Sequence, residues 1–299
     1  MSQAEELIGR LAPCLCEGEE VDLETLRSEL VARLIPLFAN PLEGPGATLQ
    51  QAFEAAGTGH ASLMTWEDDA PRLAWAFGQE GIDTRVIAAL GWPCGRVLGD
   101  ALCFECAILA SAGVHEVCLA ANTGALAEGE FDEAMDPVLS VIRTAHEDDV
   151  DEDACGCDDD CCEHGHATDE GADGGCTCGH EHADDSDDDW SDVELAVSIA
   201  IECGQLTPHQ LCQACDAVSS AGPDYVVACT GQGPRCATPE DVRLISATVE
   251  PGVDVRATTD TCSLEEALGL FEAGAVELLC LHPGQLLLDF DRLAADFDQ

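Results

Sequence analysis

Residues 222–275 read GPDYVVACTGQGPRCATPEDVRLISATVEPGVDVRATTDTCSLEEALGLFEAGA, and this stretch decides the fold. The short apolar runs 225–229 and 253–257 are each followed by a helical segment. Thr238 and Ser263 are suitable N-cap residues for those two helices. Strands that alternate with helices in this way indicate a parallel sheet with crossover helices.

The same alternation extends on both sides of this stretch. We expect further strands at 84–90, 116–121, 195–201 and 276–281, and further helices at 97–112, 131–145 and 208–221. Eight strand–helix units close into a barrel. The sequence therefore predicts an α/β protein, a (β/α)8 TIM barrel, with its first half in residues 33–146 and its second half in 193–299. Residues 1–32 are predicted to form an N-terminal helical extension.

Residues 147–192 interrupt the pattern, because they consist largely of Asp, Cys, His and Gly. A segment of this composition cannot bury enough apolar surface to offset the entropy of ordering it. We expect an acidic Cys/His-rich insertion that is disordered unless a metal organises it.

The charge is extreme: 60 Asp and Glu oppose 11 basic residues, for a net charge of -49. All of the basic residues are arginine, and the chain contains no lysine. Molar salt screens such self-repulsion, so the composition is typical of a halophilic protein in a salt-saturated cytoplasm. An acidic surface that binds basic partners is the alternative. Nucleic-acid binding is not expected, since no basic face is available for phosphates.

No membrane association is expected, because no apolar run approaches the roughly 18 residues of a membrane span. The opening residues MSQAEELIGR do not predict a secretory signal, so a cytoplasmic protein is expected. The 19 cysteines then indicate thiols or metal ligands before disulfides.

Four segments carry a family resemblance: VIAALGWPCG (86–95), HEVCLAANTGALAEGEFD (115–132), SIAIECGQLT (198–207) and the stretch quoted first. Together they resemble the deoxyribose-phosphate aldolases, and the chain looks like a divergent, haloarchaeal-type member. The resemblance covers about residues 84–145 and 193–282. It implies the barrel fold and the reversible cleavage of 2-deoxyribose 5-phosphate to acetaldehyde and glyceraldehyde 3-phosphate.

In that family a lysine forms an imine with the substrate, a second cation lowers the pKa of the lysine, and an aspartate relays protons. The imine-forming lysine aligns with Val227, the second cation with Arg256 and the aspartate with Cys118. The resemblance therefore implies a scaffold without its Schiff-base chemistry.

The phosphate end of the family's site is altered as well. The glycine pair that binds the phosphate aligns with Thr259 and Asp260, and a second phosphate-binding segment aligns with residues 279–282. A carboxylate at this place should repel a phosphate. Glu202, Thr230 and Gly233 match residues of the family's scaffold.

Four residues are candidates for a pocket at the barrel mouth: Cys118, Glu202, Cys229 and Arg256. Alternation along a strand places Val227 and Cys229 on one face. The thiols either line a site for a ligand, or they are small buried hydrophobic residues.

The insertion supplies the candidate metal ligands. They are Cys155, Cys157, Cys161, Cys162, His164, His166, Cys176, Cys178, His180 and His182. Thiolates and imidazoles suit Zn, Ni or Cu, although a low-complexity acidic loop that acquired Cys and His by drift is the alternative. No nucleotide cofactor is expected.

Two functions remain open from the sequence. The first is an aldolase-like barrel without aldolase chemistry, acting as a metal-binding or thiol-redox protein. The alternative is a lyase of 2-deoxyribose 5-phosphate or a related small aldehyde that uses altered active-site residues. The expected partners are metal ions and an unknown small molecule, with a homo-oligomer possible.

Overall fold

The computed structural model describes residues 3–16, 22–38, 44–146 and 195–297. The insertion, its predicted disorder and its ten candidate metal ligands therefore lie outside the described residues. Within the described part of the chain, no helix is long and apolar enough to cross a membrane.

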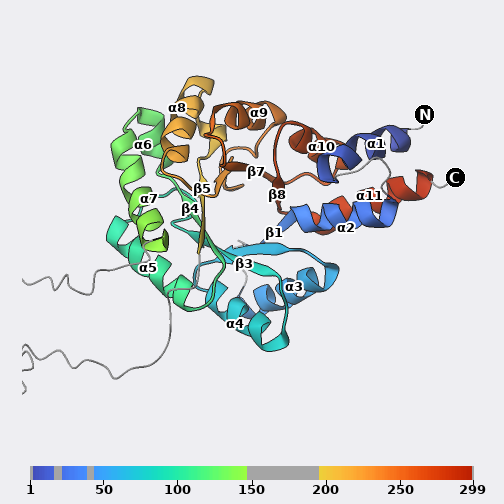
Figure 1. The fold of residues 1–299 in the computed structure, drawn as a ribbon, viewed down its shortest axis with the longest axis horizontal. Coiled ribbons are helices and arrows are strands. Elements are labelled where there is room, and N and C mark those ends of the chain that lie inside the picture. The colour runs from blue at the N-terminus through green and yellow to red at the C-terminus, as the bar shows by residue number, and fades with distance from the viewer. Residues whose placement is uncertain (1–2, 17–21, 39–43, 147–194, 298–299) are drawn as a thin grey trace, which may run out of the picture. The chain divides into compact units, whose positions relative to one another are not determined.

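Eight parallel strands form a closed barrel in the order of the chain, β1 to β8, with β8 paired to β1 (Figure 1). The strands are β1 (Leu34–Phe38), β2 (Ser62–Trp66), β3 (Arg85–Leu90), β4 (Glu116–Ala120), β5 (Ala196–Ala200), β6 (Tyr225–Val227), β7 (Asp254–Thr259) and β8 (Glu277–Cys280). The predicted TIM barrel is confirmed.

Helices follow the strands and cover the outside of the barrel (Figure 1). They are α3 (Pro45–Thr58), α4 (Ala70–Glu80), α5 (Gly99–Ser111), α6 (Thr123–Glu128), α7 (Phe131–His146), α8 (Pro208–Ser219), α9 (Pro239–Thr248), α10 (Leu264–Glu272) and α11 (Pro283–Phe297). The N-cap prediction for Thr238 is confirmed, because its side chain accepts a hydrogen bond from the backbone N–H of Asp241.

Two helices precede the barrel: α1 (Gln3–Leu15) and α2 (Leu23–Arg33). Ion pairs link them to the last two helices, from Arg10 to Glu272 at 2.7 Å and from Arg27 to Asp291 at 2.6 Å. These exposed pairs add little stability, so the buried leucines of α1 and α2 supply most of the attachment.

The hydrophobic core has two parts, as expected for strands with alternating side chains. Most buried residues lie between the strands and the helices. A smaller apolar cluster fills the barrel interior, and it consists of Ile35, Met64, Ile87, Ala89, Trp92, Cys118, Ala120, Ala200, Val227 and Leu279. The interior is thus packed with side chains, which leaves the loops at the carboxyl ends of the strands as the place for a site.

Candidate functional site

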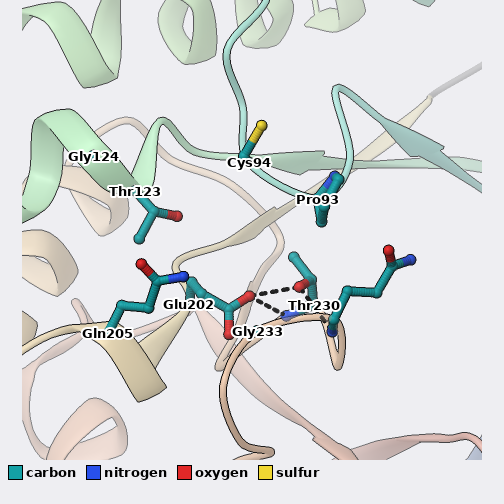
Figure 2. Close-up of a pocket in the computed structure, with 9 residues that line it drawn as sticks. Pro93, Cys94, Thr123, Gly124, Glu202, Gln205, Thr230 and Gly233 are labelled. Atoms are coloured by element: carbon teal, nitrogen blue, oxygen red, sulfur yellow. Dashed lines mark hydrogen bonds between the residues drawn. The ribbon is translucent and has the colours of Figure 1, made fainter.

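A cavity of about 140 Å³ lies among the loops that follow strands β3 to β6 (Figure 2). Nine residues line it: Pro93, Cys94, Thr123, Gly124, Glu202, Gln205, Thr230, Gln232 and Gly233. All of them come from the carboxyl-terminal face of the barrel, where barrels of this type build their sites.

Glu202 is the one charged residue of this lining. Its backbone is left-handed, with φ 50° and ψ 59°, and no other non-glycine residue in the described ranges has a positive φ. Such a conformation costs about 1–3 kcal/mol and persists only where its surroundings impose it. The side chain is buried, with 2% of its surface exposed.

The two carboxylate oxygens of Glu202 differ in their surroundings (Figure 2). Oε2 accepts hydrogen bonds from the backbone N–H of Thr230 at 3.1 Å and from the Thr230 hydroxyl at 2.5 Å. Oε1 is buried and has no hydrogen-bond partner. A buried acceptor without a donor is costly, so this carboxylate is held in an unfavourable environment by its neighbours.

Two glycines give this arrangement its room. A Cβ on Gly233 would lie 2.0 Å from Oε1 of Glu202, so the carboxylate packs directly against the glycine backbone and any larger residue there would displace it. Gly95 has a positive φ, and a Cβ there would lie 2.3 Å from the carbonyl oxygen of Ala120. Its close approach brings the loop with Pro93 and Cys94 against the end of β4.

Val227 lies fully buried in the barrel interior. Its apolar neighbours in this cluster include Cys118, Ala200 and Leu279, and its register partner on β7 is the buried Arg256. No amine of this chain replaces the one that the family resemblance places here, since the sequence has no lysine.

Arg256 is also buried, with 1% of its surface exposed, and neighbouring groups balance its charge. Its Nη1 donates to Glu116, its Nε donates to Glu277 at 2.7 Å, and its guanidinium lies 3.4 Å from the ring centre of Tyr225. Burial acts to lower the pKa of Arg256, but the two carboxylates outweigh it and raise that pKa overall. This residue is a permanent cation with two counterions.

The four pocket candidates from the sequence do not share one cavity, although Cys118 and Arg256 lie near each other inside the barrel. Among them only Glu202 lines the cavity. Cys118 is in the interior cluster, where burial raises the pKa of its thiol to about 12. Cys229 packs in the outer core, where a hydrogen bond with Cys203 is the largest of the effects that raise its pKa to about 12.

The prediction that Val227 and Cys229 share a face is wrong. Val227 belongs to the barrel interior, whereas Cys229 packs with the outer core. The reason is that β6 ends at Val227, so strand alternation no longer applies two residues later.

Sequence reasoning missed Cys94, Thr123, Gln205 and Gln232 as lining residues. Their position in the sequence could have indicated them, because each follows the end of a strand by only a few residues. The positions aligned with the family's phosphate site lie outside the cavity lining: Thr259 is buried at the end of β7, and Asp260 is exposed.

No metal site is found in the part of the chain that the structure describes, where no group of three or more His, Cys, Asp or Glu side chains could hold an ion. The ten candidate ligands of the insertion are outside that part. Their role stays a prediction.

No family model matches this chain. Its sequence is similar to curated deoxyribose-phosphate aldolases. The enzyme of Thermococcus gammatolerans is 28% identical over 193 residues, which is 64% of this chain and 66% of that enzyme. The enzyme of a Geobacillus species is 25% identical over 228 residues, 75% of this chain and 79% of that enzyme. These relatives support the deoxyribose-phosphate aldolase family.

Solved structures agree on the fold. The tetrameric deoxyribose phosphate aldolase of Aeropyrum pernix has a TM-score of 0.69 and 14% identity, covering 98% of this chain and all of its own. An aldolase named QR15 has a TM-score of 0.66 and 15% identity, covering 88% of this chain and 96% of its own. At these identities the structures show a shared barrel and no more.

Proposed function

We propose that this chain is a deoxyribose-phosphate aldolase family member that lacks Schiff-base chemistry and binds a small ligand non-covalently at the Glu202 cavity. The observation that carries the proposal is Val227, an apolar side chain inside the barrel at the aligned position of the imine-forming lysine. The supporting evidence comes from both ends of the family's site and from the cavity itself.

At the position where the family forms its imine, this chain has no nucleophilic side chain. A Schiff base needs a primary amine, and removing the covalent nucleophile removes the mechanism instead of slowing it. Arg256 cannot substitute for it, because its guanidinium stays protonated and is paired with Glu116 and Glu277.

The residues aligned with the family's phosphate site are also unfavourable for binding a phosphate. Asp260 stands at the aligned position of a phosphate-binding glycine, and no arginine lines the cavity. A negatively charged substrate would therefore meet a protein of net charge -49 without a local cation to hold it.

Thiol catalysis in the barrel is not favoured either. A thiol with a pKa of about 12 is almost entirely protonated at neutral pH, and the thiolate is the reactive form. Cys118 and Cys229 therefore fit the alternative of small buried hydrophobic residues.

The test is the family reaction itself. Purified protein in molar KCl is incubated with 2-deoxyribose 5-phosphate, and acetaldehyde is measured with an aldehyde dehydrogenase, beside an authentic deoxyribose-phosphate aldolase as the positive control. We expect no release above the protein-free sample. Release that disappears in Glu202→Gln would contradict the proposal and favour an aldolase that uses altered residues.

A second proposed function is metal capture by the insertion, favoured by ten Cys and His side chains between residues 155 and 182. Protein purified under reducing conditions is analysed for Zn, Ni and Cu by mass spectrometry, before and after a chelator. The control is the same chain without residues 147–192. Equal metal content in both proteins would rule out this role.

Self-association is proposed from the Aeropyrum pernix relative, which is described as tetrameric. The described part of this chain exposes apolar side chains on α4 and α5, Trp75 at 67% and Phe104 at 69%, which could serve as a contact. Light scattering in molar KCl should give a mass that is a multiple of 31.4 kDa. A monomer that persists at high protein concentration would contradict it.

A further inference from the structure

We infer that Cys229 and Cys236 form a disulfide bond when the folded protein meets a peroxide, which closes part of the cavity wall into a covalent ring. This inference goes beyond the proposed function and does not depend on it. It is carried by the place of the two cysteines on one loop, by the contacts that bring them together and by their different exposure.

The two cysteines stand at the two ends of the loop between β6 and α9. Cys229 lies just beyond the end of β6, and Cys236 lies just before the start of α9. Three of the residues between them, Thr230, Gln232 and Gly233, line the cavity. A bond between the two sulfur atoms would therefore enclose this part of the wall in a ring.

Contacts with Thr258 on β7 bring the two ends of the loop together. Its carbonyl oxygen accepts from the Cys229 thiol at 3.9 Å and from the backbone N–H of Ala237 at 3.3 Å. Its hydroxyl donates to the carbonyl of Cys229. Because Ala237 directly follows Cys236, one residue of β7 holds both cysteines beside each other. Their thiols are near enough to share a hydrogen bond.

The exposure of the thiols sets the order of events. Cys229 is fully buried, and so is its other thiol neighbour, Cys203. Cys236 is partly exposed and belongs to neither a helix nor a strand. An oxidant in solution therefore reaches Cys236 first. Rotation about its single side-chain torsion can then carry its sulfur to that of Cys229.

The reaction consumes one molecule of peroxide in two steps. Hydrogen peroxide oxidises the sulfur of Cys236 to a sulfenic acid, and cleavage of its O–O bond releases one water. The sulfur of Cys229 then attacks the sulfur of Cys236 and forms the S–S bond. The expelled hydroxyl leaves as a second water with the thiol proton of Cys229. Two thiols thus give two electrons and two protons to the peroxide.

The surroundings make this a slow reaction and a lasting bond. The hydrogen bond with Cys229, followed by burial, raises the pKa of Cys236 above its usual range. Few thiolates exist at neutral pH, so attack on the peroxide is slow. Thiols of high pKa are also poor leaving groups, which slows reduction of the disulfide. The pair is therefore suited to retain a record of oxidation and unsuited to rapid turnover.

Peptide mapping without reduction tests the pairing. The full chain is reduced, freed of reductant and treated with a small excess of hydrogen peroxide in molar KCl, and its remaining thiols are then blocked with N-ethylmaleimide. Trypsin and Asp-N together release fragments 224–235 and 236–240, in which Cys229 and Cys236 are the single cysteines. We expect these two fragments to be recovered as one linked pair that separates on reduction.

Two other results would overturn the inference. The first is Cys236 recovered as its maleimide adduct although the exposed Cys94 and Cys262 have been oxidised. The second is a disulfide that joins Cys236 mainly to any cysteine other than Cys229. The map of the wild-type protein decides between these outcomes without relying on a variant.

Two variants and a control assign the two roles. Cys229→Ser should lose the linked pair and leave a sulfenic acid at Cys236 that dimedone labels. Cys236→Ser, at a partly exposed position, should leave Cys229 reduced. Cys262→Ser removes an exposed thiol from the loop after β7 and should keep the linked pair.

Circular dichroism establishes that each variant is folded. Equal dimedone labelling of Cys236 in the wild type and in folded Cys229→Ser would contradict the role of Cys229. Oxidation of Cys229 to the same extent in folded Cys236→Ser would contradict the role of Cys236. The pairing is judged on peptides alone, so its outcome is independent of the acetaldehyde measurement.

Discussion

Arg256 is a buried cation that serves the barrel's structure. Its Nη1 and Nε pair with Glu116 and Glu277, and Ser198 donates to the same Glu116 oxygen at 2.7 Å. Removing one partner of a buried ion pair leaves an uncompensated charge, which costs more than the pair contributed. Arg256 therefore contributes to the stability of the barrel interior.

Replacing this arginine tests the structural role. Arg256→Met should lower the free energy of unfolding by about 3–5 kcal/mol, because the buried Glu116 then keeps only the more distant Arg85, at 3.7 Å, as a counterion, and Glu277 loses its pair. The double variant Arg256→Met with Glu116→Gln should recover part of that loss. Urea unfolding in molar KCl measures all three proteins, and a single variant as stable as the wild type would contradict the interpretation.

The thiols of the barrel offer a second test at the level of single residues. Cys118 and Cys229 should react with iodoacetamide far more slowly than the exposed Cys94 and Cys262, because burial and neighbouring groups hold their pKa near 12. Timed alkylation at neutral pH followed by peptide mass spectrometry gives each rate. Fast labelling of Cys118 in folded protein would instead support thiol chemistry.

Among the elements, β6 and β2 show where sequence reasoning reached its limit. We applied the strand's alternation of side chains as far as Cys229, but β6 ends at Val227. The apolar run continues past that point, so the sequence does not indicate where the strand ends. The strand β2 (SLMTW) was not anticipated, because its Ser62 and Thr65 are polar although both are buried. The strand–helix order from β3 onward was predictable because apolar runs alternate there with helical segments, most of which are amphipathic or capped.

The cavity was only partly predictable for a related reason. Glu202 could be named from its strand end and from the family resemblance. Its left-handed backbone and its unpaired oxygen depend on Thr230 and Gly233, which approach it only in the folded barrel. Spacing along the sequence does not report such contacts.

A buried histidine makes one junction between elements sensitive to pH. His60 precedes β2, and its Nδ1 donates to the carbonyls of Leu34 at 2.8 Å and Val31 at 3.1 Å. Burial lowers its pKa below the usual 6.5, so the unfolded chain binds the proton more readily than the folded one. Its contribution to stability is therefore lost as pH falls from about 6.5 through the lowered pKa.

Unfolding free energies measured between neutral and mildly acidic pH check this point. The wild type should lose stability in that window, and His60→Asn, which keeps a donor near Nδ1, should show a shallower slope. Glu80→Gln serves as the control and should follow the wild type. Identical slopes for the wild type and His60→Asn would contradict the assignment.

For the whole molecule, a net charge of -49 dominates the dependence on salt. The Debye length falls from about 10 Å in 0.1 M salt to about 3 Å in 1 M salt, so molar salt screens most of the repulsion between surface carboxylates. The midpoint of thermal unfolding should rise steadily over this range in KCl. Each 1 kcal/mol of relief corresponds to about 2–4 °C in a protein of about this size. A midpoint independent of salt would contradict the view that the surface is adapted to high ionic strength.

The central claim is that this barrel forms no imine within its interior, and borohydride trapping tests it most directly. The protein is incubated with 2-deoxyribose 5-phosphate or acetaldehyde in molar KCl, reduced with sodium borohydride, digested and mapped by mass spectrometry. We predict no reduced adduct with 2-deoxyribose 5-phosphate at any site of the protein, because the side chains of this sequence include no primary amine. A substrate-dependent reduced adduct on any peptide of the protein would contradict the account.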